Sequence, residues 1–343
     1  MEFLPKTLGT RPRLAIEVRA EGVVAARAED AAAILTAVSR ADLAEGAVAP
    51  GLKAGNVADR AGVAGAIRSA LEGVAGRGMD RSRDVTLVVP DAAVRVLLLD
   101  FDSLPSKETE AMPVVRFRLK KLVPFDVDTA AVSYQVMSSS KDAVRVLAIA
   151  MPKDVLDEYE AAVTAAGYQP GAVLSSTLAA LAGLDESEAP VLVVNASEGS
   201  VTTAIVQAGI LLLHRSVDMG GEAEVESRAA VHAGGESDPF EAEAAMQTGV
   251  VQSETAHESA TREVVQAVSV AAAYFEDTLQ TTPDTLLSAG TLGAEMLAAL
   301  MQENGMEGLR VRETVDAGVI ETGAVTAAVP RGWLAGVRGA LRN

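Results

Sequence analysis

Apolar residues along the first half of the chain follow two periods, one typical of strands and one typical of helices. Residues 13–28 alternate between apolar and polar positions on either side of Glu21-Gly22, which predicts a β-hairpin with its turn at that pair. Apolar positions recur at helical spacing in residues 57–75, which predicts an amphipathic helix. The same criteria then predict two strands, a helix, a hairpin and a helix, at residues 84–90, 93–100, 107–122, 132–150 and 153–166.

A second series of strands begins after the polar linker at residues 183–190. Three strand-like runs follow in succession, with turns at Ser197–Gly199 and Ala208-Gly209. An acidic stretch, residues 222–261, is predicted to be largely helical. Beyond it the pattern predicts a strong helix and then a strand that ends in glycine, at residues 261–279 and 285–290.

The two halves of the chain therefore share one plan, in which strands joined by tight turns lead into helices. Two α/β lobes that each open with such a meander are typical of the actin-like ATPase superfamily. A doubly wound α/β protein would give much the same pattern, so periodicity alone leaves both folds open.

Composition excludes several functions. The chain has 47 acidic and 29 basic residues and a formal net charge of -18, which argues against nucleic acid as a partner. It contains no cysteine, so disulfides, thiolate metal sites and a cysteine nucleophile are excluded, and its three histidines lack metal-ligand spacing. We therefore predict no metal site and no catalytic residue. The sequence also lacks an apolar signal core and a membrane-spanning run, so we expect a cytoplasmic protein.

Several motifs occur in an order that matches one known family. They are LPSKETEAM at residues 104–112, FRLKKLVPFDVDTAAVSYQV at 117–136, and VTLVVPDAAVRVLLLDF ahead of both at 85–101. ILLLHRSVDMGG at residues 210–221 and GWLAGVRGALRN at the end of the chain continue the series. Through these motifs the chain resembles PilM, the actin-like, FtsA-like cytoplasmic component of type IV pilus assembly.

The resemblance implies a two-lobed actin-like ATPase (ribonuclease H-like) fold with an FtsA-like extra subdomain. The first lobe (subdomain 1A) would comprise residues 1–96 and 168–188, and the second (2A) residues 189–221 and 281–343. The extra subdomain (1C) would comprise residues 97–167, and an outer subdomain of the second lobe (2B) residues 222–280.

The same resemblance implies partners and a location. The chain would bind the N-terminal cytoplasmic peptide of a PilN-like inner-membrane protein and, through it, the platform and motor of the pilus. It would lie at the inner face of the bacterial inner membrane, associated with the membrane through its partners, and a homo-oligomer is a possible state of the chain. The L-type cytoplasmic component of a type II secretion system has the same fold and is the alternative.

An actin-like fold also implies ATP with Mg²⁺ between the lobes, held by two hairpin turns that need glycine for close approach to phosphate. At the first turn Glu17 stands for the family's aspartate, and Arg19 replaces a glycine. At the second, Asn195-Ala196-Ser197 stands where Asp-x-Gly is expected.

The remaining loops of the implied nucleotide site depart less evenly from the family. Glu243 is kept on the helix that faces the nucleoside, but Met246-Gln247 stands where a lysine is expected. The glycine pair Gly220-Gly221 is intact, and the last loop keeps only Gly290. We therefore predict a degenerate cleft that does not hydrolyse ATP. The alternatives are an Arg19 that pairs with a phosphate, so that ATP still binds, or an active actin-fold ATPase.

The most cationic stretch of this acidic chain surrounds a Val-Pro-Phe-Asp turn. Arg116, Lys120 and Lys121 lie there together with Phe117, Pro124 and Phe125. Basic residues at a helix C-terminus stabilise the helix dipole by about 0.3–1 kcal/mol each, which accounts for the charges without any partner. The mixture of bases and apolar anchors also favours a docking surface, and we predict that these six residues bind the partner.

Overall fold

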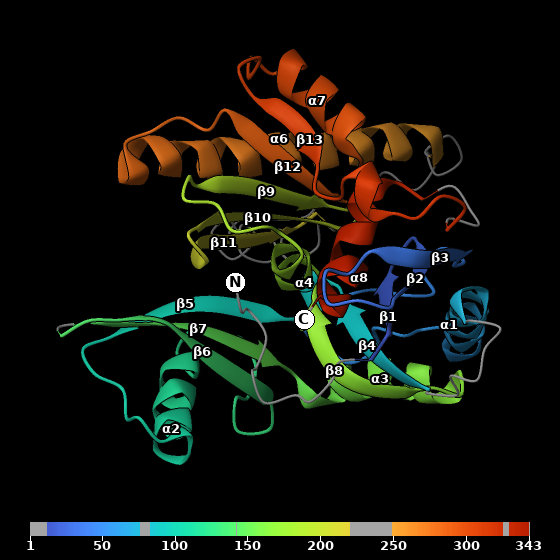
Figure 1. Ribbon diagram of the computed structural model, residues 1–343, viewed down its shortest axis with the longest axis horizontal. Helices are drawn as coiled ribbons and strands as arrows, with labels where there is room; N and C mark the ends of the chain where they lie inside the picture. Colours follow the sequence, from blue (N-terminus) through green and yellow to red (C-terminus); the bar gives the residue numbers. More distant parts are fainter. Residues whose placement is uncertain (1–11, 76–82, 142, 220–248, 325–328, 343) are drawn as a thin grey trace, which may run out of the picture.

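The structure of the 343-residue protein is a computed structural model (Figure 1). It describes residues 12–75, 83–141, 143–219, 249–324 and 329–342, with the backbone alone for 249–259. Two five-stranded sheets form two lobes, and a smaller three-stranded sheet lies beside them (Figure 1). No helix among the described residues is long and apolar enough to cross a membrane.

The two large sheets have the same topology. The first has the strand order β3-β2-β1-β4-β8 and the second the order β11-β10-β9-β12-β13. In each, three antiparallel strands are followed by two that run parallel to the central strand. The first sheet consists of β1 (Leu14–Arg19), β2 (Gly22–Ala28), β3 (Leu35–Asp42), β4 (Asp84–Val89) and β8 (Gln169–Ser175). The second consists of β9 (Val191–Ala196), β10 (Ser200–Gln207), β11 (Ile210–Asp218), β12 (Thr285–Gly290) and β13 (Arg310–Glu313).

Helices cover both faces of the first sheet. On one face α1 (Arg60–Val74) and α3 (Lys153–Ala165) pack against Ile16 and Val18 of β1. On the other face α4 (Ser176–Ala182) and α8 (Leu334–Leu341) pack around Ala15. Because successive side chains of a strand point to opposite faces, the odd-numbered polar residues Glu17 and Arg19 share the face of Ala15. The register of β1 thus directs both of them toward the middle of the molecule.

The helices α4 and α8 join the two lobes. Their core also contains Val193, Ala204 and Ala289 from the second sheet, and Figure 1 shows both helices between the lobes. Glycines allow the close approach: a Cβ at Gly339 of α8 would lie 1.7 Å from the carbonyl oxygen of Ala179 in α4. A short, fully buried helix pair of small residues is therefore the centre of the fold.

The small sheet has the antiparallel order β5-β7-β6 and carries one helix. Its strands are β5 (Arg95–Phe101), β6 (Ala131–Ser139) and β7 (Val144–Met151), and α2 (Glu108–Leu119) packs on them through Val115 and Leu119. Residues 97–167, which were expected to form the extra subdomain, include α3. In the structure α3 packs in the core of the first lobe through Val155 and Tyr159. The separate sheet and its helix end at Met151.

The second lobe is completed by α6 (Gly249–Leu279) and α7 (Ala294–Glu303), which pack on its sheet. Most of the predicted elements are confirmed, including both hairpin meanders. The prediction did not include β3, β8, α4 or β13, nor the single turns η1 (Asp91–Ala93), η2 (Ala317–Val319) and η3 (Arg331–Trp333). The predicted acidic helical stretch at 222–261 lies mainly outside the described residues.

Candidate functional site between the lobes

Two hairpin turns, one from each lobe, face each other across the line between the lobes. Ala20 and Glu21 form the turn between β1 and β2, and residues 197–199 form the turn between β9 and β10. The predicted site residues Glu17, Arg19 and Asn195 lie at the ends of the strands that lead into these turns. The structure therefore brings together the residues that the sequence assigned to the two turns.

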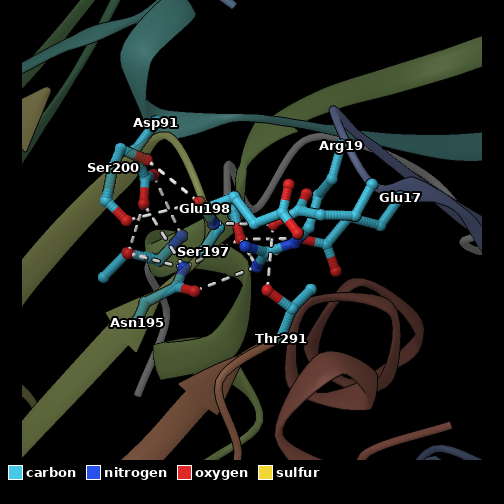
Figure 2. A network of polar contacts seen from close by, with 11 residues as sticks. Glu17, Arg19, Asp91, Asn195, Ser197, Glu198, Ser200 and Thr291 are labelled. Carbon is cyan, nitrogen blue, oxygen red and sulfur yellow. Dashed lines mark hydrogen bonds and ion pairs between the residues drawn. The ribbon is translucent and has the colours of Figure 1, made fainter. Parts of the chain in front are cut away.

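Arg19 is a buried cation that links the lobes. Its Nε donates to Glu17 Oε1 at 2.8 Å. Its Nη2 donates to Ser176 Oγ at 2.6 Å and to Asn195 Oδ1 at 2.9 Å, so one guanidinium contacts β1, the start of α4 and the second lobe (Figure 2). Only 5% of the residue is exposed, which makes these charge-assisted contacts stronger than they would be in water.

Asn195 holds the other side of this network. Its Nδ2 donates to Ser176 Oγ at 2.8 Å and to Thr177 Oγ1 at 2.9 Å. Asp91, which begins η1, accepts from the Thr177 backbone N–H at 3.0 Å and from Asn195 Nδ2 at 3.3 Å (Figure 2). The first two residues of α4 thus receive polar partners from both lobes.

Glu17 is a fully buried carboxylate beside this network. Its Oε1 accepts from Arg19 and, at 2.6 Å, from Ser176 Oγ. Within the described part of the chain Glu17 Oε2 has no hydrogen-bond partner, and it lies 2.6 Å from where a Cβ on Gly336 would stand. Burial raises the pKa of Glu17, and the neighbouring Arg19 opposes that rise without cancelling it.

His214 on β11 lies near Asp91 and is a second perturbed group in this region. Its Nε2 is buried without a hydrogen-bond partner among the described residues. Burial lowers the pKa of His214, and the charge of Asp91 partly opposes the shift. The imidazole is therefore stabilised in its neutral form.

Glu21 makes a further link between the lobes. Its Oε1 accepts from the backbone N–H of Glu198 at 2.8 Å and from Thr291 Oγ1 at 2.9 Å. Both donors belong to the second lobe, because Glu198 is in the β9–β10 turn and Thr291 follows β12. Gly290 is required just before Thr291: its φ is +89°, and a Cβ there would lie 2.2 Å from the carbonyl oxygen of Ala196.

Glu21 and Ser197 line two cavities and belong to the walls of both. One cavity, of about 330 Å³, includes Arg19, Asp91 and Asn195 in its wall. The other, of about 400 Å³, is lined by residues of α6 and by Trp333. Ser197 itself stabilises its turn, since its backbone N–H donates to the Ser200 carbonyl at 3.0 Å.

Sequence reasoning missed several members of this site. Ser176, Thr177, Asp91 and Glu21 were not among the predicted residues, although Glu21 lies in the predicted turn and Asp91 directly follows a buried strand. Three predicted residues, Gly220, Gly221 and Glu243, lie outside the described residues. In the parts of the chain that the structure describes, no group of three His, Asp or Glu side chains is placed to hold a metal ion.

The predicted docking residues surround the end of α2, which projects away from both lobes (Figure 1). Phe117 is 66% exposed, and Lys121 lies over its ring with Nζ 5.4 Å from the centroid. Lys120 pairs with Asp128 at 2.6 Å, and Pro124 is exposed.

Two of the predicted docking residues also hold the subdomain together. The guanidinium of Arg116 donates to the backbone carbonyls of Val127 and Ala130, and half-buried Phe125 packs on the core of the small sheet. Val114, Arg118 and Leu122, which were not among the predicted site residues, are exposed near Phe117.

The sheet order, the paired hairpin turns and the central helix pair define a two-lobed protein with the actin-like ATPase fold. Neither a family model nor a curated protein matches the sequence. Among solved structures, a chain of the PilM-PilN type IV pilus biogenesis complex aligns with a TM-score of 0.70 at 19% identity, covering 96% of this chain and 99% of that one. The resemblance to PilM noted in the sequence is thus confirmed at the level of the fold.

Other solved structures align with this chain at lower scores. The cytoplasmic domain of EpsL, an inner membrane component of the type II secretion system of Vibrio cholerae, has a TM-score of 0.39 at 13% identity and covers 68% of this chain and 86% of its own. The ethanolamine utilization protein EutJ from Carboxydothermus hydrogenoformans has a TM-score of 0.43 at 13% identity, with 98% of this chain and 92% of that chain covered.

Proposed function

We propose that this protein is a PilM-like adaptor at the inner face of the bacterial inner membrane, where it binds the N-terminal cytoplasmic peptide of a PilN-like membrane protein. The observation that carries the proposal is the agreement in fold with a chain of the PilM-PilN complex over almost the whole length of both chains. The order of the sequence motifs at residues 85–136 and 210–221 supports the same assignment.

The contacts between the lobes support a scaffold in preference to an ATPase. A phosphate cradle needs free backbone N–H groups and a cation with free donors. Here Nε and Nη2 of Arg19 already donate to Glu17, Ser176 and Asn195, and the N–H of Glu198 donates to Glu21. These residues do not fit a Mg²⁺-nucleotide, and we propose that the cleft neither binds nor hydrolyses ATP.

The exposed end of α2 is the proposed docking surface, formed by Phe117, Lys121 and Leu122 together with Val114 and Arg118. Exposed apolar side chains beside bases suit a partner peptide that carries apolar anchors and acidic residues, because aromatic and arginine side chains are favoured at the centre of interfaces. Arg116 and Phe125 support this surface from below through their contacts within the subdomain.

Peptide binding tests the proposal directly. The ligand would be a labelled N-terminal peptide of the PilN-like protein that is encoded in the same genome. Its fluorescence anisotropy would be measured while increasing amounts of this protein are added. We expect saturable binding that Phe117→Ser with Lys121→Glu weakens at least about tenfold, which corresponds to about 1.4 kcal/mol. The matched control, Lys53→Glu, changes a lysine that lies before α1, far from α2 in the chain, and should leave binding unchanged.

The outcomes separate the competing assignments. Absence of binding to this peptide, with binding to the cytoplasmic peptide of a secretion-system partner, would assign the chain to type II secretion. Phosphate release from Mg-ATP would support an active ATPase and contradict the proposed cleft. If ATP binds without turnover, a concentration of a hundred times its Kd would raise the free energy of unfolding by about 2.7 kcal/mol, visible as a thermal shift.

A further inference from the structure

Glu21 is placed like a bound ligand, although it belongs to the chain. It stands in the first-lobe turn between β1 and β2, and the two donors to its Oε1 belong to the second lobe. Thr291 is itself fixed to the second lobe, because its backbone N–H donates to the Ala196 carbonyl at 2.9 Å. The carboxylate therefore connects one lobe to a residue that is itself hydrogen-bonded to β9 of the other.

The two donors are of the kind that binds an anion. A backbone N–H in a tight turn and a hydroxyl group both offer a partial positive charge without requiring a cation. Both are directed at the space between the facing hairpin turns, and the Glu21 carboxylate supplies the oxygen there. An external anion could use the same donors only after Glu21 had moved.

The cavities beside Glu21 also indicate that its side chain occupies the space where an external anion would bind. It lines the cavity of about 330 Å³ beside Arg19 and also the cavity of about 400 Å³ beside Trp333. Glu21 is therefore part of the wall that the two cavities have in common. Its second carboxylate oxygen, Oε2, is buried and unpaired within the described residues, so the group is held by its Oε1 contacts and by packing.

We infer that Glu21 is an internal anionic ligand, which holds the two lobes in one closed arrangement in place of an external phosphate compound. Arg19, a cation, makes a second link between the lobes through its contact with Asn195. The fold then carries its own cleft ligand, and lobe closure does not depend on a nucleotide. This inference concerns the lobes alone and does not depend on which peptide docks at α2.

A distance measurement across the cleft tests the inference. The chain has no cysteine, so Ser69→Cys on α1 and Gln302→Cys on α7 place two spin labels, one on each lobe, at exposed sites without background. Double electron–electron resonance on the full chain should give a single narrow distance distribution. Millimolar Mg-ATP should leave that distribution unchanged.

Glu21→Ala is the decisive variant, and Glu198→Ala is its matched control. Glu198 contributes its backbone N–H and not its side chain, so its truncation removes a neighbouring carboxylate but keeps the link. We expect Glu21→Ala to broaden the distribution and shift it to longer distances, and Glu198→Ala to match the parent. Glu21→Gln keeps the acceptor oxygen and should keep the narrow distribution.

An unchanged narrow distribution in Glu21→Ala would overturn the inference, as would a shift of the parent protein on addition of Mg-ATP. If circular dichroism shows that Glu21→Ala is unfolded, Thr291→Val replaces it, because this change removes one donor and leaves the carboxylate. A partial broadening in Thr291→Val then supports the inference, and an unchanged distribution contradicts it. Loss of peptide binding without any change in these distances would count against the proposed function alone.

Discussion

The joint between the lobes makes Gly339→Ala the most direct test of the fold. A Cβ at this position would lie 1.7 Å from the Ala179 carbonyl oxygen and 2.8 Å from the backbone nitrogen of Gly183, whereas ordinary contact begins at 3.4 Å. Both neighbours are backbone atoms, so no side-chain rotation relieves the clash. The helix α8 must move away from α4, and the shared core of both lobes must move with it.

The expected magnitude follows from two opposing effects. Alanine is better than glycine inside a helix by about 1 kcal/mol. Overpacking costs about 1–3 kcal/mol and sometimes more, and a clash between two backbones belongs at the upper end of that range. We therefore expect Gly339→Ala to lower the free energy of unfolding by about 2 kcal/mol or more.

Gly65→Ala provides the matched control. Gly65 is an exposed glycine inside α1, and a Cβ there would meet no atom within 4 Å. The same substitution should therefore stabilise the protein by about 0.5–1 kcal/mol, because the helical gain has no steric cost to offset it. The two variants change the same atoms in the same type of element and differ only in their surroundings.

Urea unfolding measures both variants, and the chain supplies its own local probe. Trp333 is the single tryptophan, is 1% exposed, and directly precedes α8. Its fluorescence reports the joint, while far-ultraviolet circular dichroism reports all helices. We expect the fluorescence midpoint of Gly339→Ala to fall at least as far as the dichroism midpoint. A Gly339→Ala protein as stable as Gly65→Ala would refute the described contact between α4 and α8.

Two further predictions concern single buried or half-buried groups. Burial raises the pKa of Glu17 above its ordinary 4.5, so the native state binds this proton at higher pH than the unfolded state does. Relative to Glu17→Gln, the parent protein should therefore gain stability as the pH falls through the raised pKa, and the difference should level off below about 4.5. Urea unfolding midpoints over a pH series measure this difference. A difference that grew as the pH rose would contradict the direction of the shift. Arg116→Gln removes a cation from two backbone carbonyls and should cost about 1.5–3 kcal/mol by the same assay, whereas Arg118→Gln at an exposed position should cost less than about 0.5 kcal/mol.

Local patterns in the sequence were sufficient to predict the strands and turns that form the faces of the cleft. The alternation in residues 13–28 and the turn at 197–199 determine where the hairpins lie, and each depends only on near neighbours. The sequence analysis missed the strand β3 and the helix α4 for two different reasons. β3 follows a run of alanines without clear alternation, and α4 is a seven-residue, fully buried helix that is too short to show an amphipathic period.

The side-chain network could not be predicted from the sequence in the same way. The sequence identified Arg19 as a departure from a glycine turn, but its partner Ser176 lies 157 residues away. Glutamate in a turn is most often solvated, and Glu21 becomes a link only once the second lobe is in place. Partners such as these depend on how two separately folded sheets meet, which periodicity within either sheet does not encode.

The repeated topology explains why a few residues determine the state of the cleft. Each lobe directs one hairpin turn at the other, so whatever occupies the space between the turns is in contact with both lobes. If the turns are bare, as glycines make them, an external anion is needed to join them. In this chain Glu21 and Arg19 extend from one turn and its strand to the opposite lobe, at 2.8 Å from the N–H of Glu198 and 2.9 Å from Asn195 Oδ1. On the inference drawn above, side chains at the two turns would be enough to make the arrangement of the lobes independent of a ligand, while the sheets and the helix joint remain the same.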